Sequence, residues 1–532
     1  MSRRPGAHLG TYPVRMRPDD LFPRTVIRNA RLVPVGGRTA PEHPVDLRIR
    51  DGKVTEVAVS LEADRDEQVH DASGRWAIPG LWDAHVHMAQ WSLARTRLDL
   101  AGTGSATEGA DRVRREVARR AREGDRTSVI VGYGHRSATW PRPATVAELD
   151  AVSGEHPVIL VSGDAHNGWL NSAALGLLGL PPRAGALDED DWFPVFARLD
   201  DLPGATAAKE HAYREAAHAA AAKGVVGITD MEFSGAVREW PERFSAGLTT
   251  LRVRTAVYAA ELAHVLEAGW RSGDPLGDSS GLIEMGPLKI ISDGSLNTRT
   301  AYCCEPYADA SAAHLEHPRG KQNTSPEQLR ELVGRAHAAG LRVAVHAIGD
   351  AAVSSALDAF ATTGATGSIE HAQLVRLEDL ERMGRLGVVA SVQPAHLLDD
   401  RDVTMACWPD RADRCFALRS MLDAGVRLAM GSDAPVAALD PWLTLAAAVH
   451  RSADGREPWH PEQAVSVAEA LAASTDGQGT LGVGSRGDLV LLDADPRVRD
   501  VPSTDTAAVG ARLRGLPVAA TFLAGRPTWS RL

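Results

Sequence analysis

The chain has 532 residues, of which 44% are hydrophobic and 24% are charged, and its formal net charge is -11. These values are ordinary for a soluble globular protein with a large core. No basic block stands out, so the charge distribution gives no support to nucleic-acid binding. No apolar run approaches the ~18 residues of a membrane span, so we expect no membrane partner.

Residues 1–24 contain basic residues but no apolar segment of the kind a secretory signal carries, and we expect them to form a flexible leader. The chain has four cysteines, and none of them are in C-x-x-C spacing. This pattern favours a reduced, cytoplasmic protein without structural disulfides.

Short strands and turns are predicted at both ends of the chain. Near the start, "TVIRNARLV" and "VDLRIRDGKVTEV" are β-branched and alternating, and the second contains the turn signal Asp51-Gly52. Near the end, "SRGDLVLLDADP" and "PVAATFLAGRPTW" are similar. We therefore expect residues 25–78 and 476–532 to form one composite β-sandwich domain.

Helices alternate with short apolar strands in the middle of the chain. In "SPEQLRELVGRAHAAG", Ser325 can cap a helix, Pro326 fits its first turn and Gly340 can end it. The strand "LRVAVH" follows. Eight such strand segments occur, and this alternation predicts an α/β fold with a (β/α)8 TIM barrel. The segments are "LWDAHVH", 224–230, 251–257, 287–294, 342–350, 367–373, 387–394 and 427–433.

The barrel is expected to comprise residues 79–92 and 206–475. The chain between His87 and Lys289 is far longer than three βα units of roughly 30 residues require. A surplus of roughly 110 residues, by the same unit length, is placed at 93–205. This stretch has apolar runs of its own, "SVIVGYGH" and "PVILVSGDAH", so we expect an inserted α/β cap subdomain after barrel strand 1.

Polar residues fall at matching strand ends: His85, His87, Lys289, His346, His371 and Asp433. An H-x-H pair alone is more often incidental, but in a barrel the carboxyl ends of the strands converge on one mouth, where active sites lie. Four imidazoles and a carboxylate at that mouth would make a metal site. Alternation along a strand puts His85 and His87 on the same side, so both can reach one ion.

Lys289 is the unusual member, because an ammonium cannot bind a cation. Burial near cations would favour its neutral amine, which can take up carbon dioxide and become a carbamate that bridges two ions. The alternative is an ordinary solvated or ion-paired lysine. Asp433 could bind a metal and take a proton from the attacking water, or merely cap the next element.

Seven stretches, in order, resemble the amidohydrolase superfamily and, more narrowly, amidohydrolase family 3, the YtcJ-like group that includes N-substituted formamide deformylases. They are "PGLWDAHVH", "VILVSGDAHNGWLNSAAL", "KIISDGSLNTRTA", "VAVHAIGDAAV", "IEHAQLV", "SVQPAH" and "GSDAPVAALDPW". The resemblance implies a barrel, a composite β domain, an inserted cap and hydrolysis of an amide or similar C–N bond.

The same resemblance implies a division of the metal ligands. His85, His87 and Asp433 would hold one divalent ion, and His346 and His371 would hold a second, with Lys289 bridging them as its carbamate. Zinc is the metal we expect, as one ion or two.

Substrate residues are expected in two stretches that depart from the family pattern. "DGSLNTR" stands where the family commonly has D-G-S-L-G-S-R, and "DAH" where it commonly has D-G-H. The candidates are His166, Trp169, Asp293 and Arg299, each of which has a structural alternative: packing for the first two, a turn or ion pair for the others. His396 is a weaker candidate for the role given to His166. Glu370, next to His371, is expected either to support the metal ligands or to be paired in the core.

The sequence therefore predicts a metal-dependent amidohydrolase acting on a small molecule. Metal-bound hydroxide would attack the carbonyl, with Asp433 as general base and then general acid. The same site could instead cleave an ester or a lactone or perform a deamination, and a metal-free regulatory or binding protein is the alternative from another class. A homodimer is expected only by resemblance.

Overall fold

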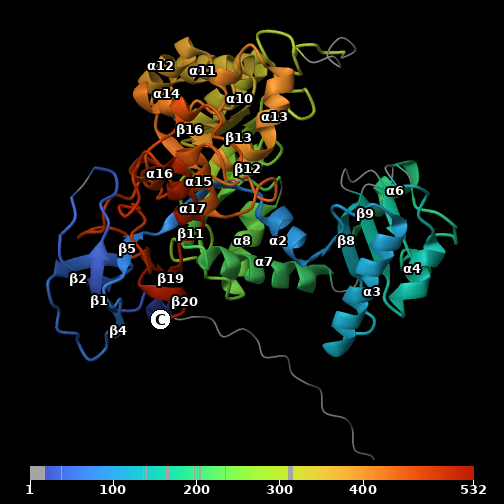
Figure 1. Cartoon of the computed structure of the whole chain (residues 1–532), viewed down its shortest axis with the longest axis horizontal. Helices are drawn as coiled ribbons and strands as arrows, with labels where there is room; N and C mark the ends of the chain where they lie inside the picture. Colours follow the sequence, from blue (N-terminus) through green and yellow to red (C-terminus); the bar gives the residue numbers. More distant parts are fainter. Residues whose placement is uncertain are drawn as a thin grey trace, which may run out of the picture. The chain divides into compact units, whose positions relative to one another are not determined.

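The computed structural model (Figure 1) describes residues 18–37, 39–135, 137, 140–162, 167–187, 189–196, 198–199, 202, 205–233, 235–308, 316–453 and 455–532. These residues divide into two compact units. Unit 1 takes in the chain up to Met88 and again Ala217–Leu532, and unit 2 is Ala89–Ala216. Most of the predicted leader, residues 1–17, lies outside the described residues, and α1 (Pro18–Leu21) follows it.

In the described part of unit 1, eight parallel strands form a barrel, in the spatial order β6, β11, β12, β13, β14, β15, β16, β17. Each of the eight predicted segments supplies one strand, which confirms the (β/α)8 fold. The strands are β6 (Leu81–Val86), β11 (Val225–Asp230), β12 (Arg252–Tyr258), β13 (Ile283–Ile291), β14 (Val343–Ala347), β15 (Gly367–His371), β16 (Val389–Val392) and β17 (Leu428–Met430).

The barrel closes where the chain after β17 meets β6. Val86 and Ala434 form a parallel bridge, and the backbone N–H of Asp433 donates to the carbonyl of His85 at 2.7 Å. The two segments approach so closely that a Cβ on Gly431 would lie 2.6 Å from the backbone nitrogen of His85. Glycine is therefore required at this position, and the closure brings the first and last barrel strands together at the mouth.

Strand β6 contains a bulge at Ala84 and His85. Ile228 pairs with Asp83 and Asp230 pairs with Val86, so β6 has one residue more than β11 over this stretch. A bulge redirects side chains relative to strict alternation. As a result, Trp82 and Ala84 line a cavity of about 880 Å³ in the amino-terminal half of the barrel, while His85 reaches the cluster of side chains at the mouth.

The barrel helices lie between the strands along the chain. In α10 (Pro326–Ala338), Ser325 and Gln328 form the predicted capping box, Pro326 occupies the first turn, and Leu329, Val333 and Ala336 are buried. The other helices of unit 1 are α8 (Ala236–Ser245), α9 (Leu262–Ala268), α11 (Asp350–Thr363), α12 (Leu377–Leu386), α13 (Leu397–Cys407), α14 (Leu418–Asp423), α15 (Pro441–His450), α16 (Val467–Ala473) and α17 (Thr506–Arg514).

Strands from both ends of the chain build the second sheet of unit 1, so β1 and β2 in blue join β19 and β20 in red in Figure 1. β5 connects the two halves, because it pairs with β1 on one side and β18 on the other. The strands are β1 (Thr25–Leu32), β2 (Val45–Arg50), β3 (Lys53–Ala58), β4 (Gln68–Asp71), β5 (Trp76–Pro79), β18 (Leu489–Leu492), β19 (Val518–Leu523) and β20 (Arg526–Ser530). Both ends of the chain thus contribute to one sheet, as the composite β domain requires, while the sandwich arrangement stays a prediction.

Unit 2 contains its own sheet, β7 (Leu98–Asp99), β8 (Ile130–His135), β9 (Val158–Ser162) and β10 (Gly168–Leu170), in the order β10-β9-β8-β7. Its helices are α3 (Ala106–Arg122), α4 (Val146–Ser153), α5 (Ser172–Leu177) and α6 (Glu189–Phe196), and α2 (Met88–Thr96) and α7 (Ala205–Ala221) connect it to unit 1. The unit is thus an α/β insertion between barrel strands β6 and β11, extending beyond the expected 93–205 at both ends. Across the described chain, no helix has the length and apolar character needed to cross a bilayer.

Candidate metal centre

The six predicted ligand residues all lie at or near the carboxyl ends of barrel strands. His85 is in β6, Lys289 in β13, His346 in β14 and His371 at the end of β15, while His87 and Asp433 follow β6 and β17. His85 and Lys289 are 1% and 2% exposed, and His371 and Asp433 are also buried. The fold thus gathers residues that are far apart in the sequence into one buried polar site.

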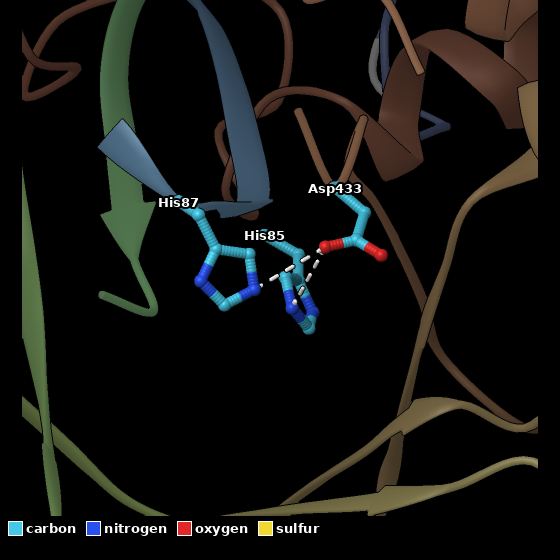
Figure 2. Close-up of side chains that lie close together, drawn as sticks. All are labelled: His85, His87 and Asp433. Carbon is cyan, nitrogen blue, oxygen red and sulfur yellow. Dashed lines mark ion pairs between the residues drawn. The ribbon is translucent and has the colours of Figure 1, made fainter. Parts of the chain in front are cut away.

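Figure 2 shows His85, His87 and Asp433 turned toward one another. The Nε2 atoms of His85 and His87 lie 3.5 Å and 3.4 Å from the same carboxylate oxygen, Oδ1 of Asp433. One ligand atom from each residue lies within 4.8 Å of the other two. Two imidazole nitrogens and a carboxylate oxygen in this arrangement fit a divalent metal ion.

A second group of possible ligands shares Asp433. His371, His396 and Asp433 also have ligand atoms within 4.8 Å of one another, and Nε2 of His396 is 3.8 Å from Oδ2 of Asp433. This Nε2 is buried and has no hydrogen-bond partner among the described residues, as expected for a nitrogen that could bind an ion. The sequence suggests His396 only as a residue of the substrate pocket, although it follows strand β16 as the other predicted ligands lie at or follow theirs.

The carboxylate of Glu370 fixes the orientation of His85. Nδ1 of His85 lies 2.7 Å from Oε2 of Glu370, and both side chains are almost fully buried. Because Nδ1–H donates to this carboxylate, the lone pair is on Nε2, the nitrogen that faces Asp433. Burial alone would raise the pKa of Glu370, but the hydrogen bond from His85 and the nearby Lys289 outweigh it and lower this pKa to about 2.

Lys289 lies within the same cluster, with Nζ 3.5 Å from Nε2 of His85. Burial lowers the pKa of Lys289 from its ordinary value, although Glu370 and Asp433 act in the opposite direction. Burial also lowers the pKa of His85, and the positive charge of Lys289 adds to the effect. Both shifts favour neutral nitrogen atoms, which is the state that ligand chemistry requires.

His346 packs against His371 with ring centroids 4.6 Å apart, but it belongs to neither three-residue group. Its Nε2 lies 3.1 Å from the carbonyl oxygen of Gly294. When Nε2–H donates to this carbonyl, Nδ1 carries the lone pair and is the nitrogen available to an ion. Burial, reinforced by Lys289, lowers the pKa of His346 to about 4, so the ring is neutral at pH 7.

The backbone is strained where two of these residues leave their strands. His371, Ala372 and Asp433 have positive φ values of 71°, 42° and 56°. Non-glycine residues in this region cost of order 1–3 kcal/mol each and persist where the surrounding structure imposes them, commonly at functional sites. The surrounding structure therefore holds His371 and Asp433 in an unfavourable backbone conformation, which supports a functional role for both residues.

Of the predicted substrate residues, Asp293 has a structural role in this structure. Its fully buried carboxylate accepts hydrogen bonds from the backbone N–H groups of Tyr302, Ile348 and Gly349. Burial raises the pKa of Asp293 to about 7, against the opposing effect of these bonds. The carboxylate orders the loops after β13 and β14, and this use of its oxygens gives no support to the predicted substrate contact.

Trp169 lies in the core of unit 2, where its indole N–H donates to the carbonyl of Thr145 and its ring packs edge-on against Trp140. It has no exposed surface, so its placement supports the packing alternative rather than a substrate contact. Arg299 lies half-buried in the loop after β13 with φ 56°, and its substrate role stays a prediction. His166 lies outside the described residues.

Comparison with known proteins gives consistent results. A profile described as the amidohydrolase family matches residues 68–528. The chain is 29% identical to the protein LONG AFTER FAR-RED 3 of Arabidopsis thaliana, over 76% of this chain and 73% of the relative. It is 27% identical to YtcJ of Bacillus subtilis (80% and 85%) and 25% identical to the N-substituted formamide deformylase of Arthrobacter pascens (88% and 91%).

A solved structure supports the same conclusion. An uncharacterized metal-dependent hydrolase from Pyrococcus furiosus matches with a TM-score of 0.73 and 26% identity, over 89% of this chain and 99% of that one. The barrel and its histidine–carboxylate cluster thus define a metal-dependent hydrolase. The chain belongs to the amidohydrolase family, and the predicted enzyme class, a hydrolase of carbon–nitrogen bonds, is confirmed.

Proposed function

We propose that the protein hydrolyses an amide-type C–N bond of a small molecule at the cluster of His85, His87 and Asp433. The observation that carries the proposal is the convergence of both imidazoles on one oxygen of Asp433. A divalent metal held by these three residues would lower the pKa of a bound water and polarise the substrate carbonyl. Two imidazoles and one carboxylate form a ligand set found in catalytic zinc sites, so zinc is the proposed metal.

Asp433 is the proposed proton carrier. Burial alone would raise the pKa of its carboxyl, but the neighbouring histidines outweigh burial and hold this pKa well below its ordinary value. The group is therefore ionised at neutral pH and able to accept a proton from the attacking water, which it can return to the leaving nitrogen. Its two oxygens face different histidines, so one can remain on a metal while the other takes the proton.

Replacing Asp433 with Asn tests this assignment, because the amide keeps the size of the side chain but cannot act as a base. We expect kcat to fall by about 10²- to 10⁴-fold while the protein stays folded. Asp423→Asn is the matched control, since Asp423 is exposed on α14 and pairs only with Arg419 among the ion pairs of the described residues. An Asp433→Asn variant with the parent kcat would refute the base assignment.

Metal content and a substrate panel test the proposal as a whole. Protein purified without chelator should contain at least one equivalent of metal, and a content far below one would refute the metal centre. The panel should include a formamide, an acetamide, an ester, a lactone and an amino-heterocycle. Activity on only the ester, the lactone or the amino-heterocycle would refute amide hydrolysis and would support one of the alternative reactions at the same site.

We further propose that Lys289 takes up carbon dioxide, and that its carbamate would link the first ion to a second one held by His371 together with His346 or His396. Support comes from the buried amine beside His85 and from the second ligand group on Asp433. Lys289→Ala should then reduce the metal content from two equivalents to one. His346→Ala and His396→Ala, measured separately, would identify the remaining ligand. A parent protein with a single equivalent would reject the bridge.

A further inference from the structure

Three aromatic rings form a row over the ends of neighbouring strands at the barrel mouth. His87 follows β6, Phe233 follows β11, and Tyr258 ends β12. The rings of His87 and Phe233 are stacked with centroids 5.1 Å apart, and those of Phe233 and Tyr258 are 5.4 Å apart. Phe233 therefore lies directly beside one of the proposed metal ligands.

Phe233 is 51% exposed in spite of these contacts. Tyr258 is anchored by a hydrogen bond from its hydroxyl to the carbonyl of Met231, so the middle ring is supported on both sides while part of it faces outward. A large apolar ring left exposed next to a polar catalytic cluster is unfavourable unless another apolar group covers it.

A second exposed apolar side chain lies on the other side of β6. Val436 is 66% exposed and follows β17, and its backbone N–H donates to the carbonyl of Asp433 at 2.9 Å. Because β11 and β17 are the two barrel neighbours of β6, Phe233 and Val436 flank the strand that carries His85 and His87. Phe233 and Val436 thus place exposed apolar side chains on both sides of His85 and His87 at the barrel mouth.

We propose that Phe233 is a specificity-determining residue that stacks on an aryl or similarly bulky apolar group of the substrate, next to the bond that is cleaved. This inference rests on the proposed function, because it places that group beside the metal ligand His87. Offset stacking and burial of the exposed ring would both favour an aryl group over a methyl group. The substrate class is therefore an amide with an apolar aromatic substituent, rather than a small or charged amide.

Two metal-chelating probes test the proposal independently of turnover. Benzohydroxamate and acetohydroxamate share the chelating group and differ only in phenyl against methyl, so the ratio of their Kd values isolates the apolar contact. We expect the parent protein to bind the phenyl compound about tenfold more tightly or better. Phe233→Ala should bring this ratio close to one, and Phe233→Leu should retain part of it. Leu377→Ala, at an exposed leucine at the start of α12, should leave the ratio unchanged.

The ratio also separates substrate contact from a structural role. If Phe233 only shields His87, its removal weakens both probes equally, the ratio stays at the parent value, and the proposal is overturned. A parent protein with no preference for phenyl would overturn it as well. Binding of neither hydroxamate would instead contradict the metal centre, and with it the proposed function. Turnover should show the same effect. In Phe233→Ala, kcat/KM should fall more for formanilide, the aryl amide, than for N-methylformamide.

Discussion

The contact between Glu370 and His85 gives the sharpest test of how this site is held together. The 2.7 Å bond joins two side chains that are each 1% exposed, so water cannot replace either partner. A hydrogen bond to a charged group is worth about 1.5–3 kcal/mol. At about 1.4 kcal/mol per factor of ten, Glu370→Gln should weaken metal binding about 10- to 100-fold, in the range seen when residues that orient metal ligands are removed.

Competition against a chromophoric chelator at fixed pH measures this effect directly. Glu378→Gln is the control, because it makes the same chemical change at an exposed position on α12 and should leave the metal Kd unchanged. Circular dichroism would verify that Glu370→Gln is folded. A folded Glu370→Gln protein whose metal Kd is within threefold of the parent value would refute the idea that this carboxylate positions His85.

Other expectations concern the whole molecule. Gly431→Ala should lower the free energy of unfolding by about 1–3 kcal/mol, because the new Cβ would meet the backbone of His85 at the barrel closure; an unchanged urea midpoint would contradict this. Burial alone would raise the pKa of Asp476, but its contacts with Arg254 and Arg486 outweigh burial and lower that pKa. The ionised carboxylate of Asp476 therefore contributes fully to stability at neutral pH. This contribution is lost as pH falls below about 3.9, the pKa of an aspartate in the unfolded chain. Asp476→Asn should be less stable than the parent at pH 7, with the difference shrinking below about pH 4; a difference that is independent of pH would argue against this ion pair. Removing metal with a chelator should lower Tm, and zinc restored to 100 times its Kd should return about 2.7 kcal/mol of stability, whereas equal Tm values would exclude binding to the folded state.

Local patterns in the sequence are sufficient to predict the fold and most of the polar side chains that gather at the barrel mouth. Strand and helix periodicity depends on neighbouring residues alone, so the eight barrel strands and the cap of α10 could be predicted from short stretches. Histidines and a carboxylate at the ends of those strands, such as His85 and Asp433, then had to converge, because the carboxyl ends of barrel strands share one mouth.

Contacts between distant segments decided what each side chain does. Asp293 and Trp169 carry polar groups suited to a substrate, but the hydrogen bonds they make with residues elsewhere in the chain place them in structural roles. Likewise, Glu370 pairs with His85 and His396 approaches Asp433, although the members of each pair lie in or after different barrel strands. Sequence spacing carries no information on such pairs, because only the closure of the barrel brings their side chains close to one another.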